Sequence, residues 1–156
     1  SDRRFGRLAP RSMKITSAIR LYLMVIAVLT LALGAMILFM PVNFYAGYGL
    51  DLSGKVDLLN ELRAPGLFML GLAGFCTLGV IRTDFQQPAI WLGSLFNSSY
   101  GLSRLLGFAI DGLPHDGFVV AGAVELVLGL VGLSLIWWQT RSRPAPTPLP
   151  TARHSR

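Results

Sequence analysis

Four long apolar runs follow one another along the chain, separated by short polar stretches. They cover approximately residues 18–40, 62–81, 88–110 and 117–138. Because a helix needs about 20 residues to cross the roughly 30 Å hydrocarbon core of a membrane, each run is long enough to span it. The runs also lack the alternating pattern of a barrel wall, and an isolated strand cannot satisfy its backbone in lipid. The pattern therefore predicts an all-α fold, a bundle of four transmembrane helices.

A shorter helical pattern precedes the second run. From about Ser53 onward, apolar residues alternate with charged ones, as they do in a helix that lies on a membrane surface. Pro65 then removes one backbone donor, which predicts a kink at the mouth of the membrane. We expect a short interfacial helix between the first and second transmembrane helices.

Basic residues gather on one predicted side of the membrane. Eleven Lys and Arg residues fall in the N-terminal segment, in the connection between the second and third runs, and in the tail. The two opposite loops hold Lys55, and Arg63 at a helix mouth, among five acidic residues. Since cytoplasmic loops are enriched in Lys and Arg, we expect both termini in the cytoplasm. The chain then divides into a basic cytoplasmic segment (1–17), a four-helix membrane domain (18–138) and a Pro- and Arg-rich cytoplasmic tail (139–156).

Composition narrows the class of protein further. Hydrophobic residues make up 53% of the 156 residues and charged residues only 14%, which is typical of a membrane protein. The net charge of +6 does not indicate nucleic-acid binding, because the basic residues lie at the ends of the chain and not over one polar surface. We expect a multi-pass protein of a bacterial inner membrane, in contact with membrane lipids. An aromatic belt agrees, with Trp91, Trp137 and Trp138 at the cytoplasmic boundary and Tyr45 and Tyr48 just outside the first helix.

Arg104 lies inside the third run, where an unpaired charge costs roughly 2.5–3.5 kcal/mol. It is about six residues from the end of that run, and Glu125 is about eight residues into the fourth. At about 1.5 Å per residue, both lie near the same depth beneath the extracytoplasmic surface. A short turn makes the two runs antiparallel neighbours, so we expect Arg104 and Glu125 to form an ion pair.

Polar and small residues recur around this pair at helical spacing. Small residues let a second helix approach closely, and residues three, four and seven apart share one helix face. The fourth run carries Gly122, Glu125, Gly129 and Gly132 on such a face. The predicted polar cluster comprises Glu61, Arg63, Asn97, Tyr100, Arg104, Asp111 and Glu125.

The glycines of the second and fourth runs are open to two interpretations. Gly71, Gly74, Gly122 and Gly129 fit close packing within the chain, and they also fit contact with a partner. The ion pair likewise fits either a structural role, fixing the register of two helices, or a ligand or proton site.

Three stretches of the sequence resemble a known family. They are NELRAPG (60–66), SRLLGFAIDGLP (103–114) and VEL (124–126). They are similar to the small four-helix bacterial membrane proteins grouped as domain of unknown function 4345. In these proteins Glu-Leu-Arg opens the second helix, an Arg-containing third helix runs into an Asp-Gly turn, and a Glu lies in the fourth. The resemblance covers about residues 18–138 and implies the bundle and the charged cluster of Glu61, Arg63, Arg104, Asp111 and Glu125. It implies no activity.

Residues that carry catalysis or hold metals are sparse in the sequence. Cys76 is the single cysteine, which excludes an internal disulfide and paired-cysteine zinc or redox motifs, so we expect it to be a packing residue. His115 and His154 lie outside the helices without a placed nucleophile, which argues against a hydrolytic triad and against haem ligation within the bundle. Asp111, His115 and Asp116 share a Gly- and Pro-rich turn, where capping and turn chemistry is a better explanation than metal binding. We therefore expect no catalysis, no metal and no cofactor.

Two classes of function remain open on these residues. In the first, the protein is a non-catalytic accessory or structural subunit that docks beside other subunits of a larger membrane complex through its glycine faces. In the second, it is a small transport or ligand-binding protein, in which Arg104 and Glu125 receive an anionic lipid or a quinone-like molecule. Folding of Arg104→Lys without ligand binding would favour the second class, because Lys cannot reproduce bidentate recognition.

Overall fold

The computed structural model describes residues 9–141, with side chains from Ile15 onward. The described elements are five helices, which confirms the predicted all-α class. They are α1 (Ala9–Phe39), α2 (Pro41–Ala46), α3 (Val56–Ile81), α4 (Thr83–Asp111) and α5 (Asp116–Arg141). The expectations for residues 1–8, for the tail 142–156, and for the side chains of Arg11 and Lys14 fall outside the described part.

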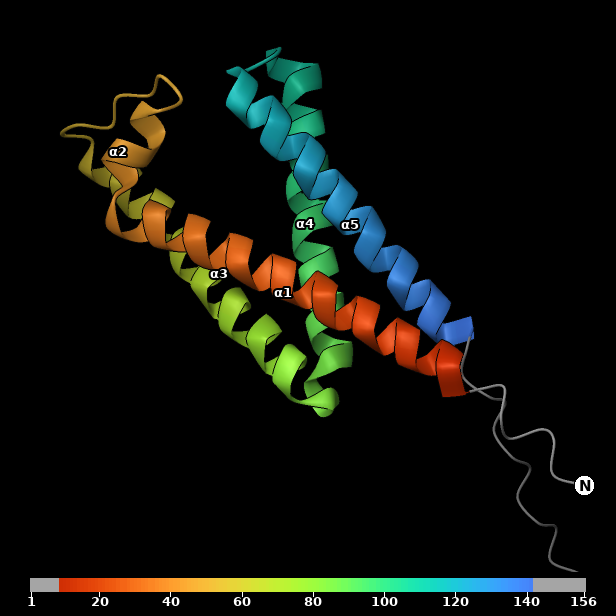
Figure 1. The fold of residues 1–156 in the computed structure, drawn as a ribbon. Coiled ribbons are helices and arrows are strands. Elements are labelled where there is room, and N and C mark those ends of the chain that lie inside the picture. Colours follow the sequence, from red (N-terminus) through yellow and green to blue (C-terminus); the bar gives the residue numbers. More distant parts are fainter. Residues whose placement is uncertain (1–8, 142–156) are drawn as a thin grey trace, which may run out of the picture.

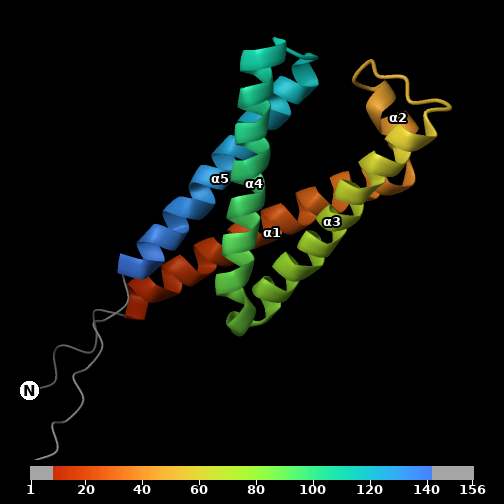
Figure 2. The same cartoon turned by 180° about the vertical axis from the view of Figure 1, so that it is seen from behind.

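The four long helices form two closely packed pairs, α1 with α3 and α4 with α5 (Figure 1). The pairs lie against each other at one end of the molecule and diverge toward the other end, as both views show (Figure 2). We call the diverging end, which carries α2 and the α4–α5 turn (112–115), the turn end. The opposite end, the terminal end, holds the start of α1, the α3–α4 junction and the end of α5.

The hydrophobic core forms where α1 packs against the other helices. Ile19, Leu23 and Ile26 of α1 are at most 1% exposed, and their spacing of four and three residues places them on one helix face. Leu72 and Cys76 of α3 and Ile90 of α4 pack into the same cluster. Cys76 is therefore a core residue, as its sequence context predicts.

The α1–α3 pair crosses at two glycines. A Cβ atom on Gly34 would lie 2.8 Å from the backbone oxygen of Gly66, and one on Gly66 would lie 2.9 Å from the backbone nitrogen of Leu38. Both distances are shorter than real contacts, so only glycine permits this approach of the two backbones. Small residues at a crossing are the usual means by which membrane helices pack closely.

The prediction of four transmembrane helices is wrong. Among the described residues, three helices are long and apolar enough to cross a membrane: Ile15–Phe39, Val56–Ile81 and Asp116–Arg141. The predicted span 88–110 lies in α4, which has sufficient length but too many polar residues, including Ser94, Asn97, Ser98, Ser99 and Arg104. Ser94 and Asn97 are buried against other helices, so α4 gains its place in the fold through intramolecular contacts and not through its hydropathy.

The position of the predicted interfacial helix also needs correction. A short helix does follow the first long helix, but it is α2 at Pro41–Ala46, where Pro41 occupies the first turn and supplies a favourable helix start. The segment predicted to be interfacial forms the first turns of α3, which continues through Pro65. The first long helix begins at Ala9, nine residues before the predicted start at residue 18.

Candidate functional site

Arg104 of α4 and Glu125 of α5 form the ion pair that the sequence predicts. Arg104 Nε donates to Glu125 Oε2 at 2.7 Å, and Arg104 Nη2 donates to Glu125 Oε1 at 3.2 Å. This two-point contact between a guanidinium edge and a carboxylate fixes the relative orientation of both groups. The Arg104 side chain is 26% exposed and the Glu125 side chain 17% exposed, so the pair is mostly buried.

The inner face of α5 forms a cradle for Arg104. Gly122 allows the arginine stem to lie against the helix, because a Cβ atom there would approach Arg104 Cδ to 3.0 Å. The guanidinium carbon lies 5.5 Å from the centre of the Phe118 ring, a distance at which the ring face attracts a cation. Phe118, Gly122 and Glu125 follow at intervals of four and three residues, so one stripe of α5 contacts the whole arginine side chain.

An aromatic contact links the two helix pairs at the turn end. Tyr48, in the loop after α2, stacks on Phe118 of α5 with ring centres 4.6 Å apart, and its ring lies edge-on to His115 at 5.9 Å. Gly117 makes room for this ring, since a Cβ atom there would lie 2.5 Å from Tyr48 Cε1. A series of contacts, from Tyr48 to Phe118 and from Phe118 to Arg104, therefore connects the α2 loop with the ion pair.

Tyr45 of α2 also lies within electrostatic range of this pair. Burial raises the pKa of Tyr45, the nearby Tyr100 phenol raises it further, and the positive charge of Arg104 opposes that rise. Tyr45 of the α2 segment and Tyr100 of α4 are therefore close enough to influence each other electrostatically. The sequence predicted Tyr45 and Tyr48 to lie in an aromatic belt, and the structure shows that both rings pack against other residues of the protein.

Two further members of the predicted cluster lie on the same side of α4. Tyr100 is half-buried one turn before Arg104, and Asn97 is buried one turn earlier. The Asn97 amide donates to the backbone oxygen of Gly93 at 2.8 Å, so it satisfies its own helix instead of the ion pair. Asn97 is part of the buried polar face of α4 but does not belong to the charged site.

The structure does not bring the remaining predicted members to the pair. Arg63 Nε donates to the backbone oxygen of Leu38 at 3.3 Å, which places it at the end of α1. Glu61 is exposed on α3, and Asp111 is exposed as the last residue of α4. Within residues 15–141, the pair of Arg104 and Glu125 is the ion pair that the structure records. The seven-residue cluster is therefore divided between the two helix pairs.

The α4–α5 turn carries the residues that were weighed as metal ligands. Asp111, His115 and Asp116 are exposed there, and His115 Nδ1 accepts a hydrogen bond from the backbone N–H of Gly117 at 3.1 Å. This hydrogen bond occupies one of the two ring nitrogens of His115 with turn formation. Across the described part of the chain, no three His, Cys, Asp or Glu side chains gather in a way that could hold a metal ion.

The predicted glycine faces divide into two kinds. Gly122 and Gly129 pack within the chain, and a Cβ atom on Gly129 would lie 2.9 Å from the backbone nitrogen of Ser98. Gly71 and Gly74 of α3 are exposed, and a Cβ atom at either would meet nothing within 4 Å. The first kind thus serves the α4–α5 contact, and the second leaves a smooth strip on the free face of a candidate membrane span.

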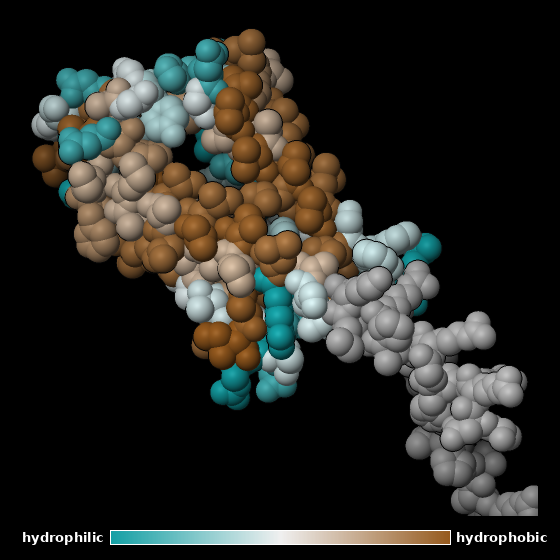
Figure 3. Space-filling view, viewed as in Figure 1, coloured by the Kyte–Doolittle hydropathy of each residue, from teal (hydrophilic) through white to brown (hydrophobic). Residues whose placement is uncertain are grey.

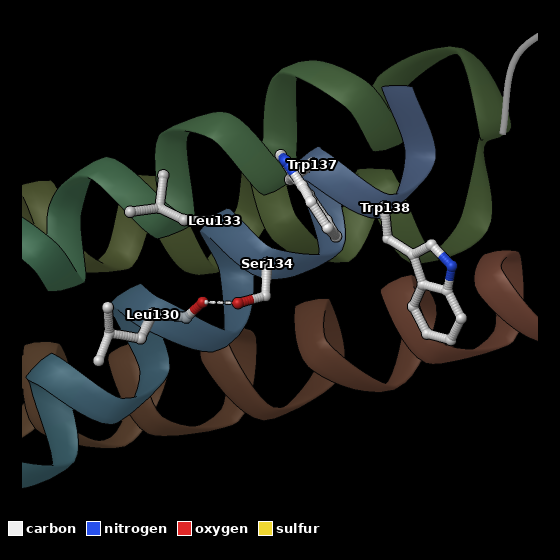
Figure 4. Close-up of a pocket in the computed structure, with 5 residues that line it drawn as sticks. All are labelled: Leu130, Leu133, Ser134, Trp137 and Trp138. Atoms are coloured by element: carbon white, nitrogen blue, oxygen red, sulfur yellow. Dashed lines mark hydrogen bonds between the residues drawn. The ribbon is translucent and has the colours of Figure 1, made fainter. Parts of the chain in front are cut away.

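An apolar groove of about 730 Å³ runs along α5 near the terminal end (Figure 4). The Ser134 hydroxyl donates to the backbone oxygen of Leu130 at 2.7 Å, so its only proton is already in a hydrogen bond. Arg141 stacks over the Trp137 ring at 3.8 Å. The described lining is therefore hydrophobic, and it comprises Leu130, Leu133, Ser134, Trp137 and Trp138.

Sequence reasoning missed Phe118 and the inward role of Tyr48. A signal for Phe118 exists, because it lies four residues before Gly122 and seven before Glu125 and so shares their helix face. No comparable signal exists for Tyr48. Its contact joins a loop to a helix about seventy residues away, and local periodicity does not report such pairings.

The helices and the largely withdrawn ion pair define an all-helical protein with three helices able to span a membrane. The chain belongs to the family described as domain of unknown function (DUF4345), whose model matches residues 18–139. The resemblance noted from the three sequence stretches is thereby confirmed. Comparisons with curated proteins and with solved structures gave no significant match.

Proposed function

We propose that the protein is a non-catalytic accessory or structural subunit of a larger membrane assembly, which it joins through the exposed face of α3. The observation that carries this proposal is the empty space around Gly71 and Gly74. Glycine in a helix interior costs about 1 kcal/mol relative to alanine, so two such residues on a free face need a compensating contact. In membranes that contact is the close approach of another helix.

The polar groups of the described chain support a role without catalysis. Arg104 and Glu125 engage each other, Asn97 donates to its own helix, and Ser94 donates to the backbone oxygen of Ile90 at 2.6 Å. Such groups stabilise and orient helices. The apolar groove on α5 adds a second surface suited to lipid or to an apolar helix.

The proposed location is the inner membrane of a bacterium, with both termini in the cytoplasm. The start of α1 and the end of α5 lie at the same end of the molecule (Figures 1 and 2). Exposed Arg20, Arg82 and Arg141 lie toward this terminal end, whereas Asp51, Asp57, Glu61, Asp111 and Asp116 lie toward the turn end. This asymmetry supports a cytoplasmic terminal end.

The test is extraction of the full-length protein in mild detergent, followed by native mass spectrometry. The wild type is expected in a defined complex with another membrane subunit. Gly71→Leu with Gly74→Leu should release it as a folded monomer, because leucine side chains hold the second helix away. Gly107→Leu is the matched control, since Gly107 of α4 also has open space around it, and this variant should keep the complex. A wild-type protein that is monomeric under these conditions would contradict the proposal.

A further inference from the structure

The guanidinium of Arg104 retains binding capacity beyond its pair with Glu125. Guanidinium has five N–H donors, and Glu125 takes one from Nε and one from Nη2. The other three have no hydrogen-bond partner among the described residues, and the side chain is 26% exposed. The Glu125 carboxylate likewise has about four acceptor positions, of which Arg104 occupies two. One donor edge and one acceptor edge therefore remain side by side.

Arg104 contacts Phe118, whose ring stacks on Tyr48 of the α2 loop, so the pair lies toward the end where the helix pairs diverge. In the space-filling view a gap separates the two pairs toward the turn end, and hydrophilic residues lie along it (Figure 3). The Arg104 guanidinium lies over the Phe118 ring at 5.5 Å, and Tyr45 of α2 is close enough to feel the charge of Arg104. Tyr48 and Phe118 join the pairs across this end through their stacked rings. An aromatic face thus lies beside the guanidinium at the junction of the two helix pairs.

The charge of the site selects among possible ligands. Because Glu125 already neutralises Arg104, a simple anion meets repulsion from the carboxylate along with attraction from the guanidinium. A zwitterion presents a negative group to Arg104 and a positive group to Glu125 at the same time. The anionic ligand considered from the sequence is therefore a poorer match than a ligand that carries both charges.

We propose that this gap binds the head group of a zwitterionic phospholipid that carries a primary ammonium group. The phosphate accepts hydrogen bonds from the free N–H groups of Arg104, and the ammonium donates to the free positions of Glu125. Arg104 is seven residues from the end of α4, or about 10 Å from the turn end. An arginine at such a depth draws head groups and water toward itself, so a lipid can reach the site from the membrane.

The test is a lipid-retention measurement on the full-length protein. Protein is equilibrated in bilayer discs that hold equal amounts of phosphatidylethanolamine, phosphatidylglycerol and phosphatidylcholine, and the lipid that stays bound in detergent is identified by native mass spectrometry. The wild type should retain phosphatidylethanolamine about tenfold over phosphatidylglycerol, the ratio expected for one hydrogen bond between charged groups. Phosphatidylcholine should also be retained less, because its methylated ammonium has no N–H to donate to Glu125.

Glu125→Gln distinguishes lipid recognition from a purely structural role. It leaves the positive charge of Arg104 without compensation, so the preference should invert toward anionic phosphatidylglycerol. Glu61→Gln removes the same charge from an exposed position on α3, and it should leave the preference unchanged. Tyr45→Phe, which removes a single hydroxyl group, should lower retention of phosphatidylethanolamine without inverting the preference.

Two results would overturn the site. One is a wild-type protein that retains the three lipids in the proportions of the disc, which decides the matter even if Glu125→Gln fails to fold. The other is an identical lipid profile for Glu125→Gln and Glu61→Gln. Neither result bears on the proposed subunit contact, because that contact rests on Gly71 and Gly74 of α3 and not on Arg104 or Glu125.

Discussion

The α1–α3 pair and the α4–α5 pair both depend on glycines for close approach, but they differ in what lies between their helices. In α1–α3 the close crossing is at Gly34 and Gly66, and Arg63 adds a hydrogen bond to the backbone oxygen of Leu38. In α4–α5 a charged pair lies between the helices, and Gly122 accommodates the arginine stem. The first pair is held mainly by packing, whereas the second is held by packing and by an ion pair that joins its two helices.

Removal of Arg104 should have the largest effect on this difference. Arg104→Ala leaves the Glu125 carboxylate withdrawn and unpaired, and we expect a loss of about 2–4 kcal/mol after allowance for partial exposure. Reversible unfolding in mixed micelles, followed by circular dichroism, measures this loss. A stability within about 0.5 kcal/mol of the wild type would show that the pair does not hold α4 and α5 together.

Overpacking of a glycine crossing should come next. Gly66→Ala places a Cβ atom 2.9 Å from the backbone nitrogen of Leu38, which cannot rotate away, and we expect a loss of about 1–3 kcal/mol. Gly71→Ala is the matched control on the same helix. Since its Cβ atom meets nothing within 4 Å, it should be neutral or stabilising by up to about 1 kcal/mol. Equal losses in the two variants, measured in the same unfolding assay, would remove the argument for a close crossing.

Removal of Arg63 should have a smaller effect than removal of Arg104. Arg63 is exposed and makes one hydrogen bond of 3.3 Å to a backbone oxygen, so Arg63→Ala should cost less than about 1 kcal/mol. Chemical unfolding curves of Arg63→Ala and Arg104→Ala, recorded side by side, give the comparison. If Arg63→Ala proved as costly as Arg104→Ala, charge would stabilise both helix pairs equally and the contrast would fail.

The smallest expected effect is a change of stability at alkaline pH. The folded protein raises the pKa of Tyr45 above 10.0, so folding favours the neutral phenol. The stabilisation that comes from this raised pKa is complete below the pKa of Tyr45 in the unfolded protein. It is lost as the pH rises through the pKa of Tyr45 in the folded protein. Tyr45→Phe should therefore reduce the alkaline decline of the unfolding midpoint. An unchanged decline would mean that folding does not raise the pKa of Tyr45.

The sequence predicted the class of fold and the central contact, but not every boundary. Apolar runs of about 20 residues identify α1, α3 and α5, because burial in lipid requires uniform hydropathy. The prediction failed for α4, whose run is long enough to span but too polar, with Ser94 and Asn97 buried within the protein. The helical pattern after Ser53 is the start of α3 itself, which continues past Pro65 in its interior, so the proline removes one backbone hydrogen bond without ending the helix.

The candidate site was predictable only in part. Depth along two antiparallel helices was sufficient to pair Arg104 with Glu125, since both positions follow from a constant rise per residue. The sequence also grouped Glu61 and Arg63, at the outer mouth of the second predicted helix, with this pair, but it could not show that α3 diverges from α4 and α5 at the turn end. The contact of Tyr48 with Phe118 depends on how a loop folds across that divergence, and no local pattern encodes it.

The most direct test is a double-mutant cycle on Arg104 and Glu125 in bilayer discs, with Arg104→Gln, Glu125→Gln and the combined variant. Glutamine keeps the approximate size of both side chains and removes their charge. We predict that the combined variant loses less stability than the two single variants together, by about 1–3 kcal/mol, because it leaves no charge unpaired. Strictly additive losses would contradict the claim that the two charges hold α4 against α5.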